Sequence, residues 1–133
     1  MTGGGFLVAR DASLFRFATI ALKQLGVVHE ASDPFGRAVT QLVDDEGRLF
    51  TIHDGLIEGF EWEAREGPFE LVPGVQEPDM STANVCPFEC RWADLTVRVA
   101  REVAETAGYP TWLLDGNGVI WDAKSVDPVQ LQL

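Results

Sequence analysis

The chain has 133 residues, of which 46% are hydrophobic, and its 10 basic and 21 acidic residues give a net charge of −11. This length and apolar content predict one folded domain, residues 1–133, and argue against disorder. The negative charge argues against nucleic acids and anionic membranes as partners, because both would repel the protein, whereas a basic protein surface would attract it.

The sequence also favours one compartment. The N-terminal residues 1–5 have neither the basic region nor the long apolar run of a signal peptide. No apolar run approaches the roughly 18 residues that span a bilayer. Two cysteines, Cys86 and Cys90, do not make the disulfide framework of a small secreted domain. The expectation is a cytoplasmic protein.

The N-terminal part of the sequence predicts one helix flanked by short strands. Apolar residues recur at helical spacing from Leu14 to Leu25, which predicts a helix over residues 12–25 that ends at Gly26. A loop is expected at residues 32–36. The strands expected around this helix are residues 6–9, 27–31, 38–43 and 48–53, the last two joined by a turn at 44–47.

The middle of the chain carries weaker signals. Residues 60–63 alternate between aromatic and acidic side chains at period two, which predicts a strand with Phe60 and Trp62 on one face. Residues 69–72 predict one more short strand. Residues 73–87 are rich in proline and lack periodicity, so they are expected to form a long connection, and long connections are often functional.

The C-terminal part predicts a second helix and a hairpin. The helix is expected over residues 91–107, and the hairpin over 111–122 around the turn Asp115-Gly116-Asn117-Gly118. Trp112 and Trp121 are expected to pack in the core beneath that helix. The tail, residues 126–131, is expected to add an edge strand or to dock against the domain.

These elements together predict an α+β fold. It would be a single two-layer domain, with an antiparallel sheet of about five to seven strands and the helices 12–25 and 91–107 packed against it. Residues 42–50 align without gaps with residues 113–121. The alignment has two explanations, an internal duplication or the same turn chemistry used twice. Strand order and oligomeric state are left open.

Metal and cofactor sites have little support in the sequence. The possible soft or imidazole ligands are Cys86, Cys90, His29 and His53, and their spacing is not that of a structural zinc module. The turn at 115–118 is similar to the start of a calcium loop, but the positions needed for further ligands and a glycine hold Val119, Ile120 and Val126. No cofactor or metal is expected, and the cysteines are interpreted as packing groups.

Catalytic motifs are also missing from the sequence. It contains no Gly-x-Ser-x-Gly elbow, phosphate loop or dinucleotide fingerprint. A small enzyme or ligand-binding domain would depend on His53, Cys86 and Asp54, and a Cys86–His53 pair in space is the arrangement that would support it. An enzyme is therefore the less favoured interpretation.

The acidic residues are concentrated in residues 44–79, which hold 11 acidic residues and two arginines. One interpretation is a solvated outer face of a sheet. The other is an interface for a basic partner, because aromatic anchors surrounded by charge are typical of steered protein interfaces. Alternation does not decide whether Phe60 and Trp62 face the core or the surface. The candidate binding residues are Asp54, Glu58, Phe60, Glu61, Trp62, Glu63 and Glu66.

The last third of the chain carries a resemblance. The segments 88–92, 112–122 and 126–128 resemble those of small acidic α+β proteins from bacteria, similar in size and charge to the immunity proteins of polymorphic-toxin systems. The resemblance implies a non-enzymatic protein that neutralises a basic partner, such as a toxin, by covering it. A regulatory or adaptor domain of a bacterial cytosolic system is the second interpretation, and the small enzyme is the third.

Overall fold

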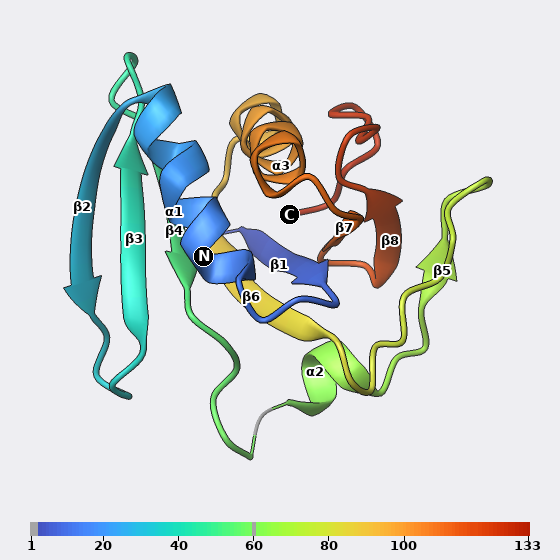
Figure 1. Ribbon diagram of the computed structural model, residues 1–133. Helices are drawn as coiled ribbons and strands as arrows, with labels where there is room; N and C mark the ends of the chain where they lie inside the picture. Colours follow the sequence, from blue (N-terminus) through green and yellow to red (C-terminus); the bar gives the residue numbers. More distant parts are fainter. Residues whose placement is uncertain (1–2, 60) are drawn as a thin grey trace.

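The computed structural model describes residues 3–59 and 61–133, and within them the chain forms one sheet of eight strands and three helices (Figure 1). The elements are β1 (Gly4–Ala9), α1 (Leu14–Leu25), β2 (Val27–Ser32), β3 (Ala38–Val43), β4 (Leu49–His53), α2 (Trp62–Arg65), β5 (Glu70–Leu71), β6 (Asn84–Glu89), α3 (Ala93–Ala107), β7 (Thr111–Leu114) and β8 (Val119–Asp122). The strand order is β2-β3-β4-β6-β1-β7-β8-β5. All neighbours are antiparallel except β5 and β8. The α+β class is confirmed, with a larger sheet than expected.

Helices α1 and α3 pack on one face of the sheet and against each other. Both are amphipathic, so each turns one apolar stripe inward, with Leu22 and Val103 fully buried. Alternate strand residues meet these stripes, among them Leu7, Phe50 and Leu113. This layer is the larger core of the protein.

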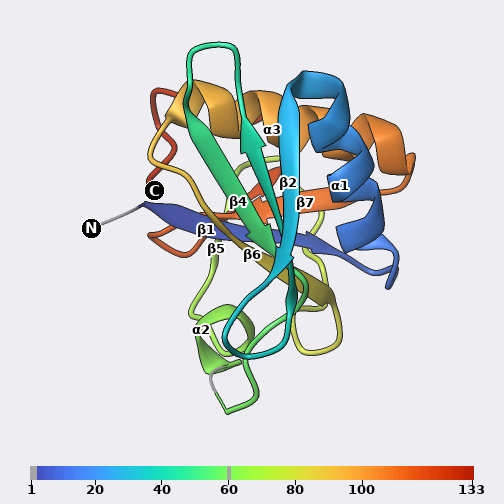
Figure 2. The ribbon, with the colours of Figure 1, turned by 90° about the vertical axis from the view of Figure 1, so that its left-hand side faces the viewer.

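The opposite face of the sheet is covered over only part of its width. Val8, Trp112 and Ile120 pack there against Ala64 and Met80, which belong to the connection between β4 and β6. Figure 2 shows α3 and α2 on opposite sides of β1 and β7. Within the described residues nothing comparable covers β3 and β4, whose outward residues are exposed or half-buried. We call this bare area the open face.

Three hairpin turns in the structure share one design, Asp-x-x-Gly-x, at residues 33–37, 44–48 and 115–119. In each, the glycine amide donates to the aspartate carbonyl at 3.0, 3.0 and 3.2 Å. The aspartate Oδ1 accepts hydrogen bonds from the amides two and four residues later. The glycines have φ of 81°, 77° and 77°, a left-handed conformation that glycine adopts without steric cost.

This shared design explains the alignment of residues 42–50 with 113–121. The turn at 33–37 has the same design and lies in the segment expected to be a loop. The hairpins join the sheet in opposite senses. The second strand of the first hairpin, β4, lies beside β6, whereas the first strand of the later hairpin, β7, lies beside β1. Repeated turn chemistry therefore accounts for the alignment better than duplication does.

The prediction of a strand at residues 60–63 is wrong. Phe60 lies outside the described residues, and Trp62 begins the short helix α2. Gly59 and Gly67, with φ of 88° and 63°, turn the chain on either side of this helix. Of α2 only Ala64 is buried, so period-two alternation here reflects no sheet.

The expected long connection at 73–87 ends inside a strand. Residues 84–89 form β6, which pairs with β1 along its whole length in the middle of the sheet. Proline is rare in central strands because it lacks an N–H group, which is why Pro87 suggested a loop. The neighbour β4 pairs with β6 only at Phe88 and Glu89, so at Pro87 one side of β6 is a local edge.

The two tryptophans of the last hairpin lie on opposite faces of the sheet. Trp121 packs on the helix side, as expected, and its indole N–H donates to Asp115 Oδ2 at 3.1 Å. Trp112 does not lie beneath α3, because it faces the other side, where its indole donates to the carbonyl of Gln76 at 2.9 Å. The tail docks without forming a strand, with Leu131 buried.

Candidate functional site

A groove of about 750 Å³ lies on the open face, at the border of the covered area. Its floor is the start of β1 and the end of β6. One wall is the turn 33–37 with His53, the opposite wall is residues 56–57 and 62–63, and the turn 115–118 closes one end. The groove therefore joins parts of the chain that are far apart in sequence.

Three consecutive glycines line the floor of the groove, Gly3 just before β1 and Gly4 and Gly5 at its start. A Cβ atom at Gly4 would meet the carbonyl oxygen of Phe88, and one at Gly5 would lie 2.5 Å from the carbonyl oxygen of Leu114. Such contacts are closer than real Cβ atoms make, so β1 approaches both neighbouring strands closely only because these residues lack side chains. The glycines thus have two effects: they let β1 approach β6 and β7 closely, and they leave this part of the floor of the groove without side chains.

One wall of the groove is a charged cluster of three residues. Arg37 Nε donates to Asp33 Oδ2 at 2.6 Å, and His53 Nδ1 lies 3.1 Å from the same oxygen. Arg37 also donates to the carbonyl of Gly55 at 2.9 Å. Burial raises the pKa of Asp33, but hydrogen bonds from the Arg37 amide and side chain, His53 and the Phe35 amide outweigh it and lower the pKa to about 2. The carboxylate holds the Arg37 and His53 side chains in place.

Two large aromatic side chains stand exposed at the groove. Trp62, on α2, is 57% exposed, and Phe35, at the tip of the turn 33–37, is 66% exposed. Glu63 and Glu89 also line the groove, and within residues 3–59 and 61–133 neither takes part in an ion pair. The groove thus combines apolar area with uncompensated negative charge.

The structure places the expected binding residues on the segment that leaves β4 and forms α2. Asp54, Glu58, Trp62, Glu63 and Glu66 are exposed, and Glu61 is half-buried, its carboxylate accepting a hydrogen bond from the Gly59 amide at 2.8 Å. Phe60 is outside the described residues. Of these residues, Trp62 and Glu63 line the groove. The sequence did not decide whether Trp62 faces the core or the surface, and the structure shows that it faces the surface.

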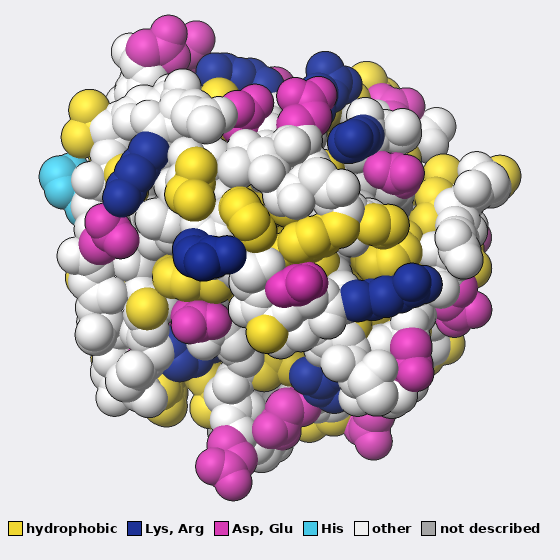
Figure 3. Space-filling model, viewed as in Figure 1, with side chains coloured by type: hydrophobic (Ala, Val, Ile, Leu, Met, Phe, Trp, Pro, Cys, Tyr) yellow, Lys and Arg dark blue, Asp and Glu magenta, His cyan; other side chains and the backbone are white. Residues whose placement is uncertain are grey.

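The acidic residues 44–79 do not form a single face. The turn at 44–47 lies at the end of the sheet opposite α2 (Figure 2). Asp44 is buried there and bonded to Arg48. In the view of Figure 3, acidic side chains gather at the lower end of the molecule, where α2 lies, and alternate with basic ones elsewhere. The candidate surface is therefore the shorter segment 54–66.

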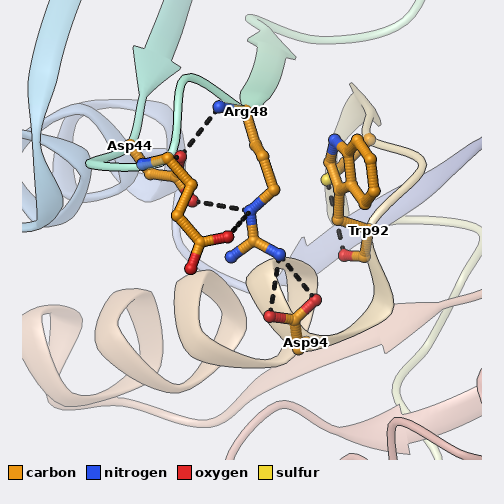
Figure 4. A network of polar contacts seen from close by, with 6 residues as sticks. Asp44, Arg48, Trp92 and Asp94 are labelled. Carbon is orange, nitrogen blue, oxygen red and sulfur yellow. Dashed lines mark hydrogen bonds and ion pairs between the residues drawn. The ribbon is translucent and has the colours of Figure 1, made fainter.

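Arg48 lies at the centre of a second polar network, which joins the turn 44–48 between β3 and β4 to α3 (Figure 4). Its Nε donates to Asp44 Oδ2 at 2.9 Å, and its NH1 donates to both carboxylate oxygens of Asp94 at 3.0 and 2.9 Å. Its guanidinium lies 5.6 Å from the ring centroid of Trp92. The hydrogen bonds to Asp94 and Asp44 raise the pKa of Arg48. This network fixes the orientation of α3 on the sheet.

The residues considered for catalysis do not come together. Cys86 is buried on the helix side of β6, and burial raises the pKa of its thiol to about 12, whereas His53 is on the opposite face. Cys90 is also buried, and burial raises its pKa. His53 instead contacts Asp33, a partner that the sequence did not suggest. The signal that could have found it is the Asp-x-x-Gly pattern, which places Asp33 at the base of a turn.

A zinc site from the four possible ligands is excluded by their placement. Both cysteines are buried under the helices, and His29 is exposed on the edge strand β2. Among the described residues no group of three or more histidine, cysteine, aspartate or glutamate side chains could hold a metal ion.

Neither α1 nor α3, the longest helices in the described part of the chain, is long and apolar enough to cross a bilayer, and the same holds for α2. No model of a known protein family matches the chain, and neither a curated protein nor a solved structure shows significant similarity to it.

Proposed function

We propose that the protein is a non-enzymatic binding protein that recognises a basic partner protein through the groove and the acidic segment 54–66. The observation that carries this proposal is Trp62, a large side chain that is 57% exposed at the mouth of a groove of about 750 Å³. Exposed aromatic groups of this size are typical anchors of protein interfaces.

The charge around the anchor supports a basic partner. Glu63 and Glu89 line the groove, and Asp54, Glu58 and Glu66 are exposed beside it. A field of one sign steers an oppositely charged protein toward the site and raises its association rate. The resemblance to immunity proteins extends the proposal to the partner class, a toxin that acts in the cytoplasm. An adaptor for another basic protein would use the same surface.

The first experiment identifies the partner. The protein is co-expressed with the product of each gene adjacent to its own, and we expect it to restore growth when one of these products is toxic. Trp62→Ala should weaken the rescue, whereas Glu105→Lys, an exposed change on α3 across the sheet, should preserve it. Failure to rescue or bind any neighbouring product would overturn the toxin proposal.

The second experiment separates anchor from steering. With the partner in hand, Trp62→Ala should raise the dissociation rate by at least tenfold, because anchor residues contribute about 2 kcal/mol or more. Glu61→Lys combined with Glu63→Lys should lower the association rate and flatten its dependence on salt, because screened steering is mostly an association effect. An unchanged salt dependence would contradict the role of the acidic segment.

One observation favours a second candidate, the binding of a small ligand in the groove. Asp33 orients His53 through Nδ1, an arrangement that fixes an imidazole for contact with a bound molecule. Among the described residues that line the groove there is no serine, threonine or cysteine, so this lining supplies no nucleophile for covalent catalysis with His53. A shift of the His53 ring resonances on addition of a ligand, absent in Asp33→Asn, would favour this candidate.

A further inference from the structure

The strand β2 leaves a six-residue edge of the sheet without a partner in the described chain. It pairs with β3 in an unbroken register, from Val27 opposite Val43 to Ser32 opposite Ala38. Proteins usually protect such edges with proline, lysine, a bulge or a very short strand. The opposite edge, β5, is two residues long and is followed by Pro73, but β2 has none of these features.

The hydrogen-bond pattern shows which backbone groups of β2 point outward. The amide of Asp33 donates to the carbonyl of Arg37 at 2.9 Å, so this pair is a hydrogen-bonded one. Such pairs alternate along an antiparallel ladder, so the groups of residues 27, 29 and 31 point to β3. The backbone groups of Val28, Glu30 and Ser32 therefore point to the free edge.

We propose that β2 pairs with β2 of a second copy of this chain, antiparallel, around a twofold axis at His29. This register sets Val28 opposite the partner's Glu30, and Val27 opposite the partner's Ala31. The outward backbone groups then bond with each other, and the helices of both copies lie on the same side of one continuous sheet.

Neighbouring registers fit less well. An axis at Glu30 would place the two Glu30 carboxylates directly opposite each other, which is repulsive. An axis at Val28 would leave Glu30, Ala31 and Ser32 beyond the end of the partner strand, opposite Gly26 and the last residues of α1. Only the axis at His29 pairs most of the strand without a clash of charges.

The β2 edge offers a second copy a locally neutral contact on an otherwise acidic molecule. Two chains of net charge −11 repel each other, so they can approach only where the surface is locally neutral. Within β2 the only carboxylate, Glu30, is paired with Lys23 of α1 at 3.4 Å. Val27 is 63% exposed on this strand and would be covered by the pairing. A basic partner would find no net attraction at this edge.

A cysteine pair tests the register. His29→Cys brings the two new thiols opposite each other in a non-hydrogen-bonded pair, with Cα atoms about 4.5 Å apart, which permits a disulfide. Ala31→Cys, on the same exposed side of β2, places them roughly 13 Å apart, too far to join. The native Cys86 and Cys90 are buried. We expect mild oxidation to give a covalent dimer with His29→Cys only, and equal cross-linking of both variants, or none, would overturn the proposal.

Sedimentation across a range of concentrations tests the edge itself. Glu30→Pro removes an outward N–H without touching the ladder to β3, and Glu30→Ala is its control, because both lose the contact with Lys23. We expect a concentration-dependent dimer for the wild type and Glu30→Ala, and a monomer for Glu30→Pro that unfolds at a similar temperature. A wild type that stays monomeric at all concentrations, or a dimer unaffected by Glu30→Pro, would overturn the proposal.

Discussion

Asp115 is a buried carboxylate that organises the last hairpin. It accepts hydrogen bonds from the amides of Asn117 at 2.9 Å and Val119 at 3.1 Å, and from the Trp121 indole at 3.1 Å. The Gln132 amide adds a longer contact at 3.4 Å. One side chain thus connects the turn, the core and the C-terminal tail.

We expect Asp115→Ala to lower the free energy of unfolding by about 2–4 kcal/mol, because several buried donors lose their acceptor at once. The measurement is equilibrium unfolding in urea. Asp122→Ala is the matched control, since Asp122 is exposed and its carboxylate accepts the Lys124 amide of a turn. Equal losses for the two variants would contradict the role given to Asp115.

Asp33 makes a prediction about acid stability. Its pKa in the folded protein is about 2, below the ordinary value of 3.8, so the folded state binds this proton less readily than the unfolded state. The resulting stabilisation is complete above pH 4 and is lost as the pH falls from about 4 to about 2. Asp33→Asn should therefore lose stability at pH 5 and show a flatter decline over this range, measured by urea unfolding at each pH. If the free energy of unfolding of Asp33→Asn fell with decreasing pH as steeply as that of the wild type, the network with Arg37 and His53 would not be what stabilises the carboxylate.

At the scale of elements, the three turns differ in how tightly their glycines are packed. A Cβ atom at Gly47 would meet nothing within 4 Å, whereas one at Gly118 would lie 3.1 Å from the carbonyl oxygen of Pro68. Both residues have φ of 77°. Replacing either glycine by alanine therefore strains the backbone to the same degree, but only the side chain added at Gly118 also meets a steric obstacle.

We expect Gly47→Ala to cost about 1–2 kcal/mol, from left-handed strain alone, and Gly118→Ala to cost more. Thermal unfolding of the two variants measures the difference. A larger loss at Gly47 would mean that the turn at 44–48 contributes more than its backbone conformation, for example through the contacts of Arg48.

Sequence patterns predicted two kinds of element: helices that bury one apolar face, and hairpin turns that contain a glycine. The periodicity of residues 12–25 and 91–107 defined both long helices to within two residues, because amphipathic packing is written in the local sequence. β6 was missed because Pro87 is tolerated at a local edge that only the strand order creates. The groove was missed for the same reason: Gly4, His53 and Glu89 meet only through the topology of the sheet.

At the scale of the whole molecule, the charge of −11 acts on stability. Like charges on a folded surface repel each other, and salt screens this repulsion. We expect the unfolding temperature to rise as the sodium chloride concentration increases from about 10 to 200 mM. At about 10 mM the Debye length is about 30 Å, so the repulsion between surface charges is only weakly screened there. Replacing Glu58 and Glu66 by glutamine should reduce this rise, because both are exposed on the acidic segment. A fall of the unfolding temperature with salt would mean that attractive pairs, such as Arg48 with Asp94, dominate instead.

The two described ends of the chain lie together beside the groove. A Cβ atom at Gly3 would be 3.0 Å from that of Leu133, and the Gly116 amide donates to the Gln132 carbonyl at 2.7 Å. Gly3 and Gly116 both line the groove. An affinity tag or fusion partner at either end would therefore emerge next to the binding surface and compete for it. A circular permutant that joins these ends by a short linker and opens the exposed turn at 45–46 would keep the fold and carry its tag at the far end of the sheet.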